Sequence, residues 1–165
     1  MVLAYRSGFY AGPCTNDRLV TVRVPIVPRS LRHAGVAAVA ATILYFSVIT
    51  PPGSGVIRTG PFGVLAYSTW LHGLAYAGLA VALAYALQDQ PWRDRTVLAA
   101  VFLVAVGYGG GIELLQSTLD ARTADFGDLL VNAVGAALAV VCWRVLTRRV
   151  RFYRARRLKD FERPV

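Results

Sequence analysis

Chemistry-bearing side chains gather in one stretch of an otherwise apolar chain. Four of the nine acidic residues fall between positions 113 and 128, flanked by long runs without charge. Burying a charge among apolar groups is costly unless the charge has a partner or a function. We therefore treat the polar residues of this stretch as a candidate site: Glu113, Gln116, Arg122, Asp125, Asp128 and Asn132.

The residue types in this stretch favour acid–base chemistry beside an anion. Glu113 and Asp128 are candidates for general acid or base, and the alternative for them is pairing between helices. The guanidinium of Arg122 suits a phosphate or carboxylate, because it forms two parallel charge-assisted hydrogen bonds. A salt bridge from Arg122 to Asp125 or Asp128 is an equally good explanation.

Four neutral or weakly basic side chains complete the candidate set. His72 is a candidate nucleophile or proton shuttle, and the alternative is a histidine hydrogen-bonded inside a helix bundle. Tyr76 follows His72 by four positions, so a helix presents both on one face. Gln116 and Asn132 either orient a substrate phosphate or hold the carboxylates in place.

A metal centre is the second choice for this cluster. Three carboxylates with an Asn and a Gln offer oxygen ligands for a hard divalent cation. A site without metal ranks first, because Arg122 already offsets the negative charge and no dedicated metal-ligand spacing is present. Cys14 and Cys142 are too few for a disulfide framework or a zinc site.

Composition identifies the environment of these residues as a membrane. Of 165 residues, 56% are hydrophobic and only 16% are charged, which exceeds the apolar content of a soluble domain. The net charge of +9 would suggest nucleic acid as a partner of a soluble protein. Because the basic residues flank apolar runs, we expect a membrane instead and no nucleic-acid partner.

Four apolar runs are long enough to cross a bilayer, which takes about 20 helical residues. Backbone polar groups in a bilayer need internal partners, so helices are expected. The sequence predicts an all-α, four-helix transmembrane bundle with cytoplasmic N- and C-terminal tails. The expected spans are about 31–50, 63–87, 96–116 and 126–146. They divide the chain into an N-terminal segment (1–30), a transmembrane domain (31–146) and a basic tail (147–165).

Basic residues predict how the bundle is oriented in the cell membrane. Sixteen of the 18 Lys and Arg residues lie in the head, the loop before the third span and the tail, leaving Arg58 and Arg122 on the other side. Cytoplasmic flanks carry an excess of such residues, so both termini are expected in the cytoplasm. The tail serves as a stop signal for insertion or, alternatively, forms an amphipathic helix on the leaflet. The three tryptophans are expected to anchor at interfaces or face lipid.

Helical spacing brings the candidate residues to one level near the outer surface. Glu113 and Gln116 are three apart and share a face, and Asp128 and Asn132 belong to one stripe of the fourth helix. His72 lies at a similar depth on the second helix. Small residues beside these positions, Gly109, Gly110, Gly111, Gly135 and Ala136, allow the third and fourth helices to approach closely.

These residues carry a resemblance to a known family. The spaced string that runs from Glu113 to Gly135 resembles the signature of the VanZ-like family of small multi-pass membrane proteins. The segment WLHGLAY, which contains His72 and Tyr76, resembles its second-helix motif. The match covers about residues 31–146. Ser68 and Thr69 stand where the family often has an Asp-Lys pair.

The resemblance implies an integral membrane bundle with a role at the cell envelope. The family's namesake is linked to low-level resistance to the glycopeptide teicoplanin, and a wider relationship places the family near enzymes acting on lipid head groups, including phosphatidylserine synthases. We expect hydrolysis or transfer of a phosphate-bearing lipid or polyprenyl head group. The alternative is a non-catalytic protein that binds such a lipid or another envelope component, and a small transporter is disfavoured.

The expected roles divide the candidate residues into two groups. The catalytic group is His72, Glu113 and Asp128. The substrate-binding group is Tyr76, Gln116, Arg122, Asp125 and Asn132.

Overall fold

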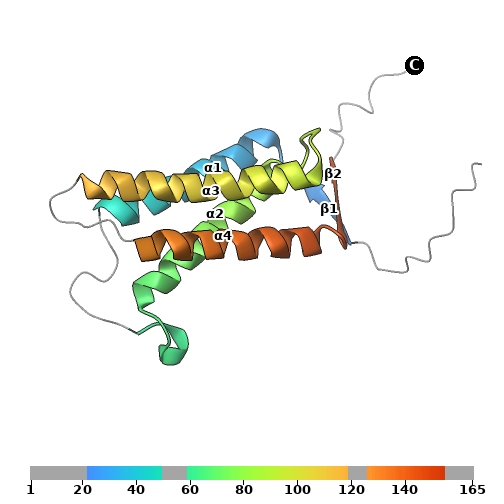
Figure 1. Cartoon of the computed structure of the whole chain (residues 1–165). Coiled ribbons are helices and arrows are strands. Elements are labelled where there is room, and N and C mark those ends of the chain that lie inside the picture. Colours follow the sequence, from blue (N-terminus) through green and yellow to red (C-terminus); the bar gives the residue numbers. More distant parts are fainter. Residues whose placement is uncertain (1–21, 50–58, 119–125, 155–165) are drawn as a thin grey trace, which may run out of the picture.

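Four long helices form the body of the protein. The structure, a computed structural model, describes residues 22–49, 59–118 and 126–154. All four helices are long and apolar enough to cross a membrane, which confirms the predicted all-α bundle (Figure 1). The helices are α1 (Arg29–Leu44), continued by a π-helical turn η1 (Tyr45–Ile49), α2 (Tyr67–Ala86), α3 (Asp94–Ser117) and α4 (Phe126–Leu146).

The second helix begins later than its apolar run. The run was predicted to be helical from about residue 63, but α2 begins at Tyr67. Residues Pro61–Gly63 form a separate 3-10 turn, η2, and Gly63 has a φ of 67°. A right-handed helix cannot pass through a residue in this left-handed conformation, so the helical run is interrupted there.

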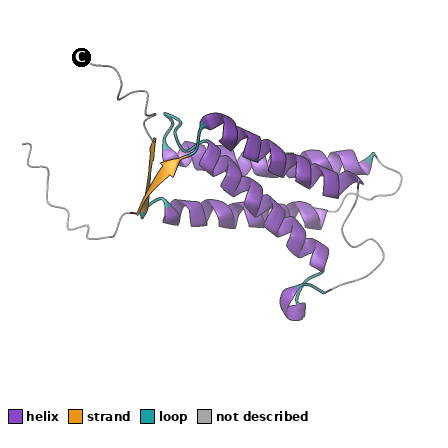
Figure 2. Cartoon of the chain, turned by 180° about the vertical axis from the view of Figure 1, so that it is seen from behind, coloured by secondary structure: helices purple, strands orange, loops and turns teal. Residues whose placement is uncertain are grey.

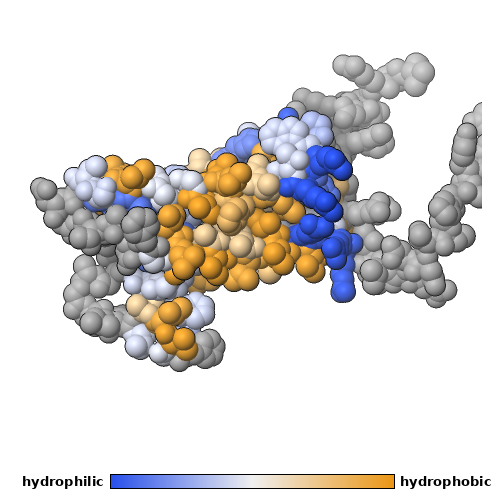
Figure 3. All heavy atoms as spheres, viewed as in Figure 1, coloured by the Kyte–Doolittle hydropathy of each residue, from blue (hydrophilic) through white to orange (hydrophobic). Residues whose placement is uncertain are grey.

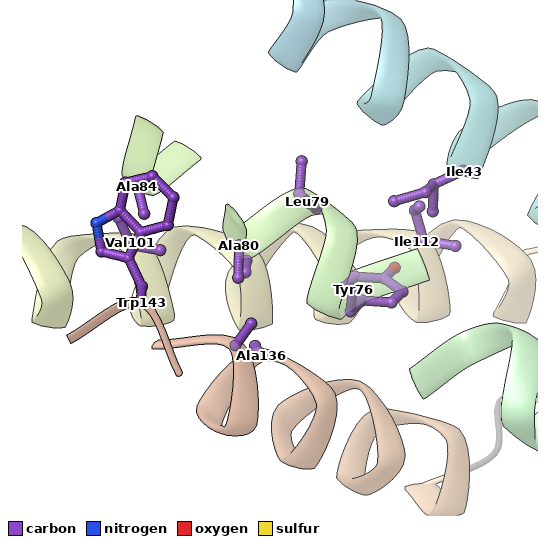
Figure 4. Packing of buried hydrophobic residues seen from close by; sticks show 11 residues of the cluster. Ile43, Tyr76, Leu79, Ala80, Ala84, Val101, Ile112, Ala136 and Trp143 are labelled. Atoms are coloured by element: carbon purple, nitrogen blue, oxygen red, sulfur yellow. The ribbon is translucent and has the colours of Figure 1, made fainter. Parts of the chain in front are cut away.

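Helix α2 packs against each of the other three helices and has its most extensive interface with α4. Alanines fill much of this core, and in Figure 4 Ala80 of α2 points toward Ala136 of α4. Apolar side chains gain little from leaving lipid for protein, so close packing through small residues is what holds such helices together.

Helices α2 and α4 approach each other closely at two glycines. A Cβ added at Gly135 of α4 would overlap the backbone of Gly73 in α2. A Cβ added at Gly73 would instead lie 3.5 Å from Cγ1 of Val131, an ordinary van der Waals distance. The crossing of α2 and α4 therefore requires glycine at position 135 but not at position 73.

This asymmetry makes a testable prediction. Gly135→Ala is expected to lower the free energy of unfolding by about 1–3 kcal/mol, the usual cost of overpacking, because backbone cannot move aside as a side chain can. Gly73→Ala, at the same crossing, should change it far less. The measurement is unfolding in mixed micelles, followed by circular dichroism as the SDS fraction rises. Equal losses for both variants would contradict the packing seen here.

The two ends of the described chain meet beside the end of α2. Strand β1 (Val22–Ile26) pairs in parallel with strand β2 (Val150–Arg154), with Val22 opposite Val150 (Figure 2). The interpretation of the tail as an amphipathic helix is therefore wrong for residues 150–154, because their backbone groups pair with β1. That this end of the bundle faces the cytoplasm stays a prediction from the basic residues.

A buried arginine fastens α1 to the end of α2. The side chain of Arg32 is 1% exposed and lies 3.0 Å from the Asp89 carboxylate. Arg32 also donates hydrogen bonds to the carbonyls of Tyr85 and Ala86, each at 3.0 Å. The last carbonyls of a helix lack partners within it, so Arg32 satisfies groups that would otherwise be orphaned.

The tryptophans differ from one another in their surroundings. Trp92 is 53% exposed, as expected for an interfacial anchor. Trp143 is buried: its ring stacks on Phe152 at 5.8 Å, and its indole N–H donates to Oε1 of Gln88 at 3.2 Å. The prediction that Trp143 is an interfacial or lipid-facing anchor is therefore wrong, because β2 and the end of α2 cover it.

The surface of the bundle is divided into an apolar belt and hydrophilic ends. Figure 3 shows hydrophobic residues across the middle of the helices and strongly hydrophilic residues beside the end where α4 terminates. Many large apolar side chains of the helices are exposed, among them Leu103, Leu130 and Leu138 at more than 60%. Apolar patches of this extent mark contact with a membrane rather than with water.

Candidate functional site

Three helix ends bring the predicted residues together on one side of the bundle. Successive helices of the bundle run in opposite directions (Figure 1), so α2 and α4 begin where α3 ends. His72 lies near the start of α2, Glu113 and Gln116 near the end of α3, and Asp128 and Asn132 near the start of α4. The common depth predicted from spacing is present.

His72 and Asp128 form the accessible part of the site. Nε2 of His72 lies 3.7 Å from Oδ2 of Asp128, and the two side chains are 22% and 32% exposed. This is an ion-pair distance, longer than a hydrogen bond. The imidazole therefore lies beside a carboxylate, an arrangement that suits a histidine taking part in proton transfer.

Tyr76 and Asn132 form the buried part of the site. Each is 1% exposed, and both lie against Gly109 of α3. A Cβ at Gly109 would be 3.1 Å from Cε1 of Tyr76 and 3.2 Å from Nδ2 of Asn132. Oδ1 of Asn132 is buried and has no hydrogen-bond partner within the described ranges. A buried acceptor without a donor costs about 1–3 kcal/mol, so it is a group for which a function should be sought.

Glu113 and Gln116 both point into the bundle, as their spacing predicted. Glu113 is 8% exposed and Gln116 is 4% exposed. Nε2 of Gln116 donates to the carbonyl of Ser47 at 2.7 Å, which ties α3 to the π-helical turn η1. Gly109, against which Tyr76 lies, is four positions before Glu113 on α3, so the two share a face of that helix. Glu113 therefore belongs to the same side of the site as Tyr76.

A pocket opens beside this cluster, between α1 and α2. Its volume is about 270 Å³, and apolar side chains such as Ile43, Phe46 and Leu71 form most of its wall. His72 and Tyr76 also line it. The sequence did not predict that α1 and η1 contribute to the pocket wall. Their lining residues carry no charge, so they resemble residues of any lipid-facing run.

Two predicted residues, Arg122 and Asp125, lie outside the described residues. Within the described ranges, no group of three His, Cys, Asp or Glu side chains is placed to hold a metal ion. The described part of the site consists of a histidine–carboxylate pair beside a buried polar cluster.

The sequence comparison decides the family of the chain. Residues 37–147, well over half of the chain, match the VanZ/LLP1 family. The chain belongs to this family. No curated protein and no solved structure matches the chain. With four apolar helices of spanning length, this VanZ/LLP1 protein is a membrane protein.

The VanZ/LLP1 match includes the whole candidate site. Every predicted site residue lies between His72 and Asn132, inside the matched range. Both strands, Val22–Ile26 and Val150–Arg154, lie outside it. The Arg32 side chain, which fastens α1 to α2, also precedes the match. The matched range is therefore the part of the fold that builds the polar cluster and the adjoining pocket.

The site of this VanZ/LLP1 protein combines two environments that suit an amphiphile. Its apolar pocket can take a hydrocarbon chain, since ligand pockets are mostly apolar with a few placed polar groups. Its polar cluster offers His72 and Asp128 at the surface and Glu113 in the interior. His72 and Tyr76 belong to both environments, and His72 is the one that pairs with Asp128.

Proposed function

We propose that this VanZ/LLP1 protein hydrolyses or transfers the head group of a phosphate-bearing lipid or polyprenyl-linked compound of the cell envelope. The observation that supports the proposal is the position of His72, which lines the apolar pocket and pairs with Asp128. A lipid with its chain in the pocket between α1 and α2 would present its phosphate to the imidazole.

The proposed reaction is proton transfer combined with displacement at phosphorus. His72 takes a proton from an attacking hydroxyl, which is water in hydrolysis and an alcohol in transfer. The hydroxyl oxygen forms a bond to phosphorus as the bond to the leaving oxygen breaks. Glu113 gives its proton to the leaving oxygen, and Asp128 stabilises the imidazolium.

The remaining residues hold the substrate in this proposal. Arg122 and Asp125 belong to the connection between α3 and α4, where the guanidinium of Arg122 would bind phosphate oxygens in bidentate fashion. Tyr76, Gln116 and Asn132 are the buried members of the site, and in this proposal the buried Oδ1 of Asn132 accepts a hydrogen bond from a donor on the substrate.

A labelled-lipid assay tests this function. Purified protein in detergent is incubated with radiolabelled phospholipids and polyprenyl phosphates, and products are separated by thin-layer chromatography. Glu113→Gln is expected to lower turnover by about 100-fold or more, because the amide cannot supply the proton. Glu162→Gln, in the basic tail, is the chemically matched control and should retain turnover. Unaltered lipid with the wild-type protein, or equal turnover by Glu113→Gln, would sink the proposal.

A second candidate function is binding without catalysis. The buried Oδ1 of Asn132 favours it, because this acceptor has no hydrogen-bond partner among the described residues and a fixed acceptor suits recognition of a ligand as well as its conversion. In a strain that depends on the protein, Glu113→Gln would then keep the phenotype while Arg122→Ala would lose it. Loss of the phenotype in both variants would favour the catalytic function.

A further inference from the structure

A second pocket lies at the opposite end of the bundle, far from His72 along the helices. Its volume is about 360 Å³, and it is formed by the connection between α2 and α3, the first turns of α3 and the end of α4. No residue of the candidate site lines it. It therefore needs an explanation independent of the chemistry proposed above.

Three arginines line this pocket from two helices. Arg95 belongs to the first turn of α3, and Arg144 and Arg148 come from the end of α4 and the turn after it. None of the three forms an ion pair with a carboxylate in the described part of the chain. Asp94 is the one acidic residue of the lining, which leaves the pocket cationic.

Arg144 belongs to the last turn of α4 and Arg148 to the turn that follows it, and both line the pocket. Two positive charges that share one pocket repel each other. An anion between them would replace the repulsion with attraction. A phosphate is the best match, because guanidinium groups bind its oxygens through two parallel hydrogen bonds.

Tryptophans complete the pocket. Trp143 forms part of its wall, held by the hydrogen bond from its indole N–H to Gln88. Trp92 is 53% exposed and lines the pocket as well. An exposed indole ring beside basic residues, as Trp92 has here, is typical of the level at which lipid head groups lie.

The position of the pocket favours a lipid over a soluble anion as its ligand. Two apolar residues of α4 near the pocket arginines are exposed. In the sequence, Val141 precedes Arg144, and Val145 lies between Arg144 and Arg148. Figure 3 shows that the hydrophilic end of α4 directly adjoins the apolar belt. A molecule with its phosphate in the pocket would find a surface for acyl chains immediately beside it.

We propose that this pocket binds the phosphate head group of an anionic phospholipid from the leaflet at the α4 C-terminal end. Arg95, Arg144 and Arg148 hold the phosphate, and the acyl chains lie along the exposed apolar face of α4. Basic pockets between transmembrane helices bind anionic head groups in this manner. This lipid is a bound partner of the fold and not the substrate at His72.

The test uses tryptophan fluorescence of the full chain in phosphatidylcholine vesicles. Either brominated phosphatidylglycerol or brominated phosphatidylcholine is added at equal mole fraction. Trp70→Phe removes the tryptophan at the far end, so that quenching reports on Trp92 and Trp143. We expect the relative binding constant of the brominated anionic lipid to exceed that of the zwitterionic lipid by at least about fivefold. Should Trp70→Phe fail to fold, the same ratio is measured on the unsubstituted chain.

A charge-matched pair of double variants identifies the site. Arg144→Gln/Arg148→Gln is expected to bring the lipid preference close to unity. Arg93→Gln/Arg149→Gln removes two exposed arginines of the same end that do not line the pocket, and it should keep the preference. Equal quenching by both lipids, or equal loss in both double variants, would overturn the proposal. Inorganic phosphate that abolishes the preference, where sulfate at equal ionic strength does not, would assign the pocket to free phosphate and also overturn it.

Discussion

Replacing Arg32 by Met is expected to destabilise the bundle by about 3–5 kcal/mol, the usual cost of breaking a buried ion pair. The side chains of Arg32 and Asp89 are 1% and 10% exposed, so little solvent can replace the lost contact. The same substitution deprives two carbonyls at the end of α2 of their donor. The effect is measured as the free energy of unfolding in mixed micelles of rising SDS fraction.

Arg29→Met is the matched control for this prediction. Arg29 also pairs with Asp89, at 3.3 Å, but its side chain is 53% exposed. Surface ion pairs contribute about 0–1 kcal/mol, so this variant should lose less than about 1 kcal/mol. Arg32→Met/Asp89→Leu should recover part of the loss, because both charges of the buried pair are then removed. Comparable losses for Arg29→Met and Arg32→Met would show that burial does not govern this contact.

Substitution of His72 by Gln is expected to have the largest effect on activity. A positioned general base contributes about 100- to 10,000-fold to a rate, and an amide cannot take up the proton. The initial rate of product formation in the labelled-lipid assay should therefore fall by that factor. Asp128→Asn should lower it less, because Asp128 acts through the imidazole and not on the substrate.

The other histidine of the chain provides the control. His33 lies on α1 and is exposed, away from the pocket lining. His33→Gln should keep the wild-type rate, and both variants should unfold at similar SDS fractions, since neither side chain is in the buried core. Wild-type turnover by a folded His72→Gln protein would remove His72 from the reaction, although the pocket that it lines would remain.

The predictions made from single helices agree well with the structure. Uninterrupted apolar runs gave the four helices, because the length needed to cross a bilayer and the rise per residue are fixed. Spacing of three and four residues placed Glu113 with Gln116 on an inward face of α3, and Asp128 with Asn132 on the side of α4 that meets His72 and Gly109. These features depend only on backbone periodicity, which a sequence carries directly.

Predictions about which helices touch were less complete. The sequence showed that Gly135 was small, but its contact with the backbone of Gly73 depends on how α2 crosses α4. The pocket wall contributed by Ile43 and Phe46 had no signal, since apolar residues look alike whether they face lipid or a neighbouring helix. Trp143 was assigned to the surface for the same reason.

The pattern of charged residues predicted the orientation in the membrane but not which charged side chains form ion pairs. Arg32 was counted among the basic residues that predict orientation, whereas in the fold it is buried against Asp89. The two residues are far apart in the chain, and only the packing of α1 on α2 brings them together. The parallel pairing of β1 with β2 likewise joins opposite ends of the sequence.

The sequence by itself determined that the chain forms four membrane-spanning helices with polar residues at a common depth, because hydropathy and helical periodicity are local properties. Only the tertiary structure decided that His72 lies beside both Asp128 and an apolar pocket. The same holds for the contact of the buried Asn132 with Gly109, and for the second pocket that arginines of α3 and α4 line together. The reason is physical: each of these contacts joins residues on different helices, and the angles at which those helices cross depend on packing summed over the whole bundle.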